Sequence, residues 1–94
     1  MSARHALRLH PRDDVAVALQ ALSPGLDCSV AGSADAQVLR VAEHVPSYHK
    51  IALRDLPAGI VVHKYGEAIG VARTAIRQGS HVHIHNLVSQ RARG

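Results

Sequence analysis

Residues 51–62, in the middle of the chain, read IALRDLPAGIVV and carry the clearest structural signal in the sequence. The first nine of them share their spacing with VALQALSPG at residues 17–25 and VARTAIRQG at residues 71–79. Each copy begins with a β-branched residue and Ala, has a second aliphatic residue five positions after the first, and reaches Gly eight positions after it. We expect each copy to form a strand, a tight helical turn and a glycine that starts a new strand, since Gly adopts positive φ without a Cβ penalty.

The segments around these copies also favour short strands. Apolar stretches follow two of the glycines, at residues 60–62 and 81–85, and residues 38–42 suggest a strand after a small, polar loop at 32–37. Residues 13–19 fit a helical face with an Asp cap as well, but the repeat favours a strand there. The copies are irregularly spaced, so we interpret them as pseudo-symmetry within one domain and not as a solenoid.

The composition agrees with a small β-rich domain. A chain of 94 residues has room for one core, and with no Trp, no Phe and two Tyr that core must consist of Val, Ile, Leu and Ala. We predict a mostly β fold over residues 1–89, built of short strands with short helical turns. Residues 90–94 read as a flexible basic tail.

Composition also narrows the functional classes. The single cysteine, Cys28, cannot form an internal disulfide, so we expect a structural thiol in a reducing compartment. No segment approaches the ~20 apolar residues needed to span a bilayer, which predicts a soluble, cytoplasmic protein without a membrane partner. The formal charge of +4 is dispersed and aromatic residues are scarce, which argues against nucleic acid and fits a small anionic substrate.

The densest chemical signal is HVHIHN at residues 81–86. On a strand, alternate side chains share a face, so His81, His83 and His85 would line one side about 6.6 Å apart, while Val82 and Ile84 enter the core. Such imidazoles can ligate a metal, act as acid, base or anion donor, or simply be solvated. No second cluster with Cys or carboxylate spacing is present, so a metal site would need ligands from another chain.

Two His-Lys pairs form a second candidate group. They are His49-Lys50 and His63-Lys64, the latter followed by Tyr65 and Gly66. Lysine offers a charge for a carboxylate and Tyr65 a hydroxyl, although the lysines also fit surface positions and Gly66 a turn. The chain has no spaced carboxylate pair, phosphate loop or nucleophile elbow, so a stand-alone enzyme is not expected.

Four phrases together resemble a known family, the SAF domain that occurs at the N-terminus or as the small subunit of altronate dehydratases. The phrases are DVAVAL at 14–19, HKIALRDL at 49–56, KYG at 64–66 with Ile69-Gly70, and GSHVHIHN at 79–86. The likeness covers nearly the whole chain, and the last phrase is the most specific. Residues 27–45 match least well.

The resemblance implies a β-clip, barrel-like fold and a role as lyase subunit. Such a hydro-lyase removes water β to the carboxylate of an aldonate or aldarate of the altronate or galactarate type, together with a large catalytic subunit. It also implies a divalent metal, Fe²⁺, held mainly by that partner. Three alternatives stay open: the small subunit of a sulfolactate sulfo-lyase, a non-catalytic carbohydrate- or anion-binding module, and a small metal-binding or storage protein. Homo-oligomerisation is also left open.

The resemblance further suggests which residues form the site. It implies that His83 and His85 are catalytic and act as metal ligands shared with the partner chain. The residues assigned to the substrate are His49, Lys50, Lys64, Tyr65, His81 and Asn86. The sequence does not decide which residue abstracts the proton.

Overall fold

A computed structural model describes residues 4–32 and 36–89, and all regular structure in these segments is β-strand. The strands are β1 (Ala6–Arg8), β2 (Val15–Ala18), β3 (Asp27–Gly32), β4 (Gln37–Arg40), β5 (Lys50–Ala52), β6 (Val61–Lys64), β7 (Glu67–Ala72), β8 (His81–Val82) and β9 (Leu87–Val88). The mostly β prediction is confirmed, while the turns in these segments are not helical. A long apolar helix that could cross a membrane is accordingly absent from the described segments.

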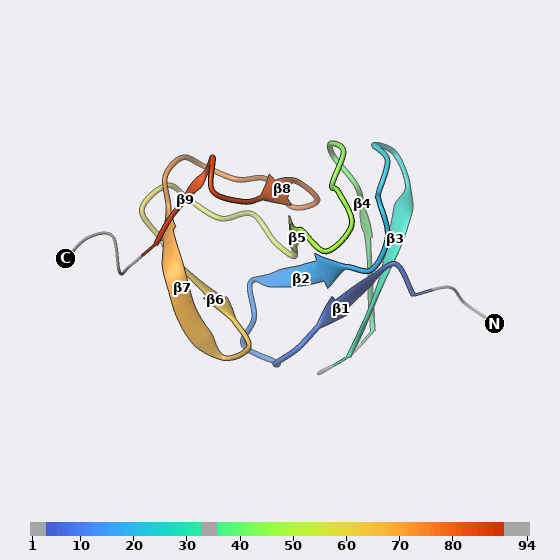
Figure 1. The fold of residues 1–94 in the computed structure, drawn as a ribbon, viewed down its shortest axis with the longest axis horizontal. Coiled ribbons are helices and arrows are strands. Elements are labelled where there is room, and N and C mark those ends of the chain that lie inside the picture. The colour runs from blue at the N-terminus through green and yellow to red at the C-terminus, as the bar shows by residue number, and fades with distance from the viewer. Residues whose placement is uncertain (1–3, 33–35, 90–94) are drawn as a thin grey trace.

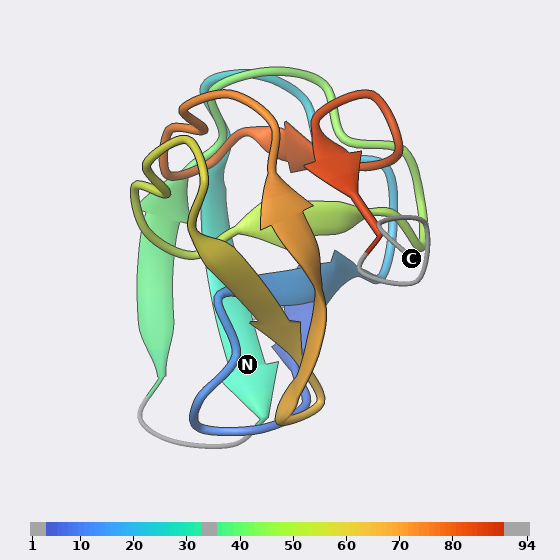
Figure 2. The ribbon, with the colours of Figure 1, turned by 90° about the vertical axis from the view of Figure 1, so that its left-hand side faces the viewer.

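The strands form two sheets. The larger has the order β4-β3-β1-β2-β5-β8 and the smaller the order β6-β7-β9. Strands β1 and β3 run parallel, whereas the other neighbouring strands are antiparallel. In Figure 1 the smaller sheet lies at the left, β3 and β4 lie at the right, and β1 and β2 lie between them. Figure 2 shows the strand direction turning from β3 through β2 and β5 to β8, so that the larger sheet curls into a half-barrel.

The three copies found in the sequence are three equivalent structural units. In each unit the second aliphatic residue makes an isolated β-bridge, and the closing glycine has a φ of 87° or 88°. A fourth unit lies at residues 40–48 and escapes the sequence comparison. There Val45 makes the bridge and Tyr48 occupies the glycine position with a φ of 67°.

The four units interlock in two pairs. Leu22 and Val45 exchange both backbone hydrogen bonds at 2.8 and 2.9 Å, and Leu56 and Ile76 do the same at 2.7 and 2.8 Å. The residue at each glycine position also donates to the end of its partner's strand. These bonds are Gly25 to Val41, Tyr48 to Ala18, Gly59 to Ala72 and Gly79 to Ala52, with lengths of 2.7 to 2.9 Å. We call residues 17–25 with 40–48 the first pair and residues 51–59 with 71–79 the second pair.

Each pair is centred on its own cluster of buried side chains. Leu22, Val41 and Val45 belong to the first cluster, and Leu56 and Ile76 to the second. Val15 of β2 packs in the second cluster and Ile51 of β5 in the first, so the two paired strands join the clusters. Burying this aliphatic surface stabilises the fold by roughly 25 cal/mol per Å².

The thiol of Cys28 is free and buried in the first cluster, as expected for a structural cysteine. Burial raises the pKa of this thiol. Because the thiolate is the reactive form, Cys28 serves packing and not chemistry.

Two buried aspartates fix the β6–β7 hairpin to the larger sheet. Asp14 is 5% exposed and accepts hydrogen bonds from Arg54 Nε and Nη2 at 3.0 and 2.7 Å. Its other oxygen accepts the backbone N–H of His63 at 2.8 Å. Asp13, which is 6% exposed, accepts the N–H of Gly66 at 2.8 Å. The start of β2 thereby sets the position of residues 63–66.

Several local predictions can be compared with these strands. Residues 15–18 form a strand, as the repeat predicts, and the strand expected at 38–42 is found as β4, ending at Arg40. The strand predicted over residues 81–85 is wrong, because β8 ends at Val82 and residues 84–86 form a turn. Val82 is buried, but Ile84 is 79% exposed and does not enter the core. The predicted tail at 90–94 lies outside the described residues.

Candidate functional site

The backbone around His49 is held by the first pair of units. Tyr48 N–H donates to the carbonyl of Ala18 at 2.7 Å, and Ala18 N–H donates back to the carbonyl of His49 at 2.8 Å. A turn bond from His49 N–H to the carbonyl of Pro46 at 3.1 Å completes the arrangement. Because Ala18 is fully buried, the imidazole of His49 projects from a well-anchored segment immediately before β5.

His81 and His83 are held by β8 and by the turn that follows it. His81 lies opposite Ile51 in the pairing of β8 with β5. Asn86, which is 9% exposed, then closes the turn: its Oδ1 accepts the N–H of His83 at 2.9 Å, and its Nδ2 donates to the carbonyl of His81 at 2.8 Å. Since both polar ends of the Asn86 side chain are used inside the chain, this residue positions the two histidines.

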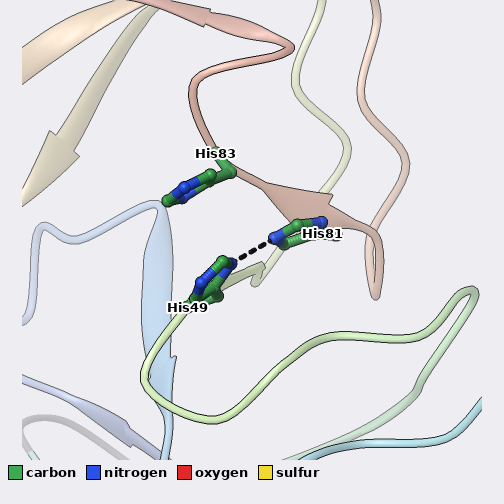
Figure 3. A group of neighbouring side chains, drawn as sticks. All are labelled: His49, His81 and His83. Atoms are coloured by element: carbon green, nitrogen blue, oxygen red, sulfur yellow. Dashed lines mark hydrogen bonds between the residues drawn. The ribbon is translucent and has the colours of Figure 1, made fainter.

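Figure 3 shows His49, His81 and His83 converging from these two segments. One nitrogen from each ring can be chosen so that all three lie within 4.8 Å of one another. His49 Nδ1 and His81 Nε2 are 2.8 Å apart, so one donates to the other according to their tautomers. The rings of His49 and His83 stack with centroids 4.1 Å apart. We call these three residues the histidine triad.

His85 lies beside the triad but is not a member of it. Its ring centroid is 5.0 Å from that of His81, and the side chain is exposed. The metal pair suggested by the resemblance, His83 with His85, therefore differs from the group that the described residues bring together. The triad fits a metal ion better, because it offers three imidazoles and the buried His83 Nδ1 has no hydrogen-bond partner.

Two lysines make the surroundings of the triad positive. Lys50 follows His49 at the start of β5 and Lys64 ends β6, and both are half-buried. The pKa of Lys50 is lowered, first by burial and then by the positive charge of Lys64. Two half-buried cationic side chains that repel each other favour the binding of an anion such as a carboxylate between them.

The same surroundings favour the neutral form of two members of the triad. Burial lowers the pKa of His83, and the charges of His49, Lys50 and His85 lower it further. Burial followed by the charges of His85, His49 and His83 also lowers the pKa of His81. Both shifts favour the uncharged imidazole, which is the form that accepts a proton or ligates a metal.

Tyr65 lies at the tip of the β6–β7 hairpin, next to Lys64. It has a φ of 57° and is followed by Gly66 at 76°, a pair of positive φ values typical of a two-residue hairpin turn. The side chain of Tyr65 is 70% exposed, so its hydroxyl is free to meet a ligand or partner. Gly66 has the turn role that its sequence context suggested.

His5 and His10, which lie outside the candidate site, have structural partners. His5 Nδ1 accepts the N–H of Ser29 at 2.9 Å, and His10 Nδ1 accepts the N–H of Arg12 at 3.1 Å. His44 is exposed.

Sequence reasoning assigned His49 to the substrate but did not group it with His81 and His83, and it did not consider Tyr48. Tyr48 is 76% exposed and directly precedes His49. The sequence contained a weak signal for both, because Val45-Pro46 repeats the aliphatic-Pro step of Leu56-Pro57 and so marks the fourth unit. That unit was hidden because Arg40 and Tyr48 replace the β-branched residue and the glycine of the other copies.

Comparison with known proteins gives a consistent assignment. The family model described as the altronate/galactarate dehydratase SAF domain matches residues 4–90. Altronate dehydratase of Escherichia coli K12 is 42% identical over 80 residues, which are 85% of this chain and 15% of that protein. Galactarate dehydratase (L-threo-forming) of the same organism is 39% identical over 74 residues, 79% of this chain and 13% of that protein.

A third relative is a small subunit. The (2R)-sulfolactate sulfo-lyase subunit alpha of Chromohalobacter salexigens is 45% identical over 51 residues, which are 54% of each chain. The chain thus matches only a small part of the two dehydratases and about half of this subunit. Because the family model spans almost every described residue, the chain belongs to the altronate/galactarate dehydratase SAF domain family.

Proposed function

We propose that this chain is the SAF part of a cytoplasmic hydro-lyase that acts on an aldonate or aldarate of the altronate or galactarate type. It contributes to β-elimination of water together with a large catalytic region of the same family. The observation that carries the proposal is the gathering of four imidazoles, with ring centroids 4.1 to 5.6 Å apart in the contacting pairs, beside the half-buried Lys50 on a chain of this family.

The reaction requires three catalytic roles from the protein. A base removes the proton from the carbon α to the carboxylate, cationic groups stabilise the enediolate, and an acid protonates the hydroxyl that leaves the β carbon as water. The enol that remains becomes a 2-keto acid by tautomerisation. No oxidant or reductant is consumed. The histidines and lysines of this face provide groups suited to each of these three roles.

We assign the groups as follows. Lys50 and Lys64 bind the substrate carboxylate, with the Tyr65 hydroxyl as an additional hydrogen-bonding group at the rim. His83 and His85 transfer protons, since the lowered pKa of His83 favours its neutral, proton-accepting form and His85 is exposed near it. His49 and His81 face the same substrate, and Asn86 acts on it indirectly by holding the backbone of His81 and His83.

A divalent metal, Fe²⁺ in view of the family resemblance, would supply Lewis-acid stabilisation of the enediolate when bound. In this proposal the large catalytic region holds most of its ligands. The names of two relatives support a multi-subunit arrangement, because each is a sulfo-lyase subunit alpha.

One observation favours a second candidate function. The sulfolactate sulfo-lyase subunit shares 45% identity over the matched residues and is itself a short chain. The elimination would then follow the same course, with sulfite leaving in place of hydroxide. A substrate panel that contains sulfolactate distinguishes the two activities.

The test is to co-purify the full-length chain with a large polypeptide of the same family from its native cells and to assay the complex with Fe²⁺. We expect aldonates or aldarates to yield 2-keto acids, which semicarbazide detects, whereas sulfolactate would release sulfite. A chain that is isolated without a large partner and without turnover would point to a binding module.

Site variants sharpen this test. The His83→Gln/His85→Gln double variant should lower kcat of the complex at least about 100-fold, the lower range for loss of general acid–base catalysis. The free energy of unfolding should change by no more than about 0.5 kcal/mol, because His85 is exposed and His83 Nδ1 has no partner to lose. His44→Gln, at an exposed histidine outside the site, is the matched control. An unfolded double variant, or full activity, would contradict the assignment.

A further inference from the structure

We propose that His49, His81 and His83 form a complete three-imidazole binding site for one divalent transition-metal ion, held by this chain without ligands from a partner. The site goes beyond the proposed elimination and concerns the chain by itself; while an ion is bound there, His83 is a ligand and does not transfer protons. It also replaces the His83–His85 pair with a different set of ligands.

The distances are close to those of a coordinated ion. Zinc–imidazole bonds are about 2.0–2.1 Å long, so two nitrogens at tetrahedral angles lie about 3.3 Å apart. His49 Nδ1 and His81 Nε2 are 2.8 Å apart, and all three candidate nitrogens lie within 4.8 Å of one another. Because the three ring planes are nearly parallel, rotation about the side-chain torsions has to turn the lone pairs toward one point when an ion binds.

The backbone that carries the ligands is already fixed. Tyr48 and Ala18 hold the segment of His49, while the amide of Asn86 holds the segment of His81 and His83. A metal therefore has to order only side-chain torsions and not a loop. Preorganisation of this kind lowers the entropic cost of binding.

The arrangement is poorly explained as packing alone. His83 Nδ1 is buried and has no hydrogen-bond partner, although buried polar atoms are nearly always paired. Three imidazoles also stack face to face, with interplanar angles of 13° to 27°, beside a half-buried lysine. A cation at the centre would use lone pairs of these rings and leave few of their nitrogens unpaired.

The ligand set selects the class of metal. Imidazole nitrogen suits Zn²⁺, Fe²⁺, Co²⁺ and Ni²⁺, whereas Mg²⁺ and Ca²⁺ require oxygen ligands. Three protein ligands leave at least one coordination position open, as in catalytic zinc sites. Glu43 Oε2 lies 3.3 Å from His81 N. Its negative charge opposes the effect of the neighbouring histidines, whose positive charges would disfavour a cation at His81.

Titration of the purified full-length chain with Co²⁺ tests the site by a readout that does not depend on activity. We expect visible d–d absorption that saturates at one equivalent and is displaced by Zn²⁺. In ¹H–¹⁵N spectra that report imidazole nitrogens, Zn²⁺ should shift His49, His81 and His83. Binding without these shifts, or shifts confined to other histidines, would overturn the proposal.

Single variants provide the comparison. His49→Gln, His81→Gln and His83→Gln should each weaken Co²⁺ binding at least about 100-fold, since loss of outer-shell groups alone costs about 10–100-fold. His85→Gln and His44→Gln should keep wild-type affinity. If His85→Gln abolishes binding while His49→Gln does not, the ligand set is wrong. The elimination activity of the complex tests the proposed function separately. That activity can persist even if the isolated chain binds no metal, so the two proposals can fail independently.

Discussion

Tyr48 has a backbone conformation that costs stability, and its side chain does not recover that cost by burial. Its three counterparts in the other units are glycines, and it has a left-handed φ of 67° although it carries a side chain. A left-handed conformation costs an L-residue with a Cβ about 1–2 kcal/mol. The ring of Tyr48 is 76% exposed, so burial in this chain does not recover that cost. Because Tyr48 directly precedes His49, we predict that its side chain serves a ligand or partner at the triad.

Tyr48→Gly should therefore increase the free energy of unfolding. Relief of the left-handed strain is partly offset by the greater freedom of glycine in the unfolded chain, about 0.5–1 kcal/mol, which leaves a net gain of up to about 1.5 kcal/mol. Equilibrium urea unfolding measures the change, and Tyr48→Ala, which keeps the strain, is the control. The activity of the complex should fall in both variants; full activity in either would show that the ring has no role.

At the scale of strands and turns, the contacts of Asp14 connect the larger sheet to the residues that carry Lys64. The carboxylate bridges Arg54, two residues after the end of β5, and the backbone of His63 in β6. The loss of this bridge would loosen the β6–β7 hairpin. The distance between Lys50 and Lys64 would then be less well fixed.

Asp14→Asn should lower the free energy of unfolding by about 1.5–3 kcal/mol, the range for hydrogen bonds to a charged group. The new amide would present a donor to Arg54 or to the N–H of His63, whichever way it is oriented. Thermal unfolding followed by circular dichroism measures the loss. Asp27→Asn is the matched control, because the Asp27–Arg40 pair spans 3.6 Å with side chains 69% and 74% exposed, and it should cost under about 1 kcal/mol. Equal losses in the two variants would refute the structural role of Asp14.

The elements that could be predicted are those fixed by local pattern. The β-branched-Ala steps of β2, β5 and β7 and the glycines that close the turns are recognisable in the sequence. The strand expected after Gly79 fails for a non-local reason. Strand β8 pairs with the short β5 only through His81 and Val82, and the Asn86 side chain then captures the backbone as a turn.

The candidate site was predictable to a similar degree. His81 and His83 are close because they are near in sequence, and a family resemblance identifies both. The place of His49 at the centre depends on the pairing of β5 with β8, which no periodicity within either segment can reveal. The unpaired nitrogen of His83 likewise depends on packing from several elements.

At the scale of the whole molecule, Gly79 joins the two pairs of units. Its carbonyl accepts the N–H of Ala42 from the first pair at 2.9 Å, while its own N–H donates to Ala52 in the second. A Cβ at this position would collide with the carbonyl oxygen of Arg40. Gly25 has nearly the same φ, but a Cβ there would meet no atom within 4 Å.

Gly79→Ala should therefore destabilise the protein more than Gly25→Ala, although the backbone strain is the same. We expect Gly25→Ala to cost about 1–2 kcal/mol from the left-handed conformation alone. The collision should add about 1–3 kcal/mol in Gly79→Ala, as overpacking usually does. Chemical denaturation compares the two variants, and similar losses would mean that the contact between the pairs is soft.

The reciprocal hydrogen bonds within each pair of units also constrain how such a chain can arise by evolution. A lone unit leaves its bridge residue and its strand-end carbonyl without partners, whereas two units satisfy each other reciprocally. The reciprocal bonds do not require a covalent link, so two separate copies of a short ancestral peptide could form the same pair. Duplication and fusion of a self-associating ancestor would then give four units, of which three kept the glycine. The fourth unit, which has Tyr48 at the glycine position, is the unit that leads directly into His49.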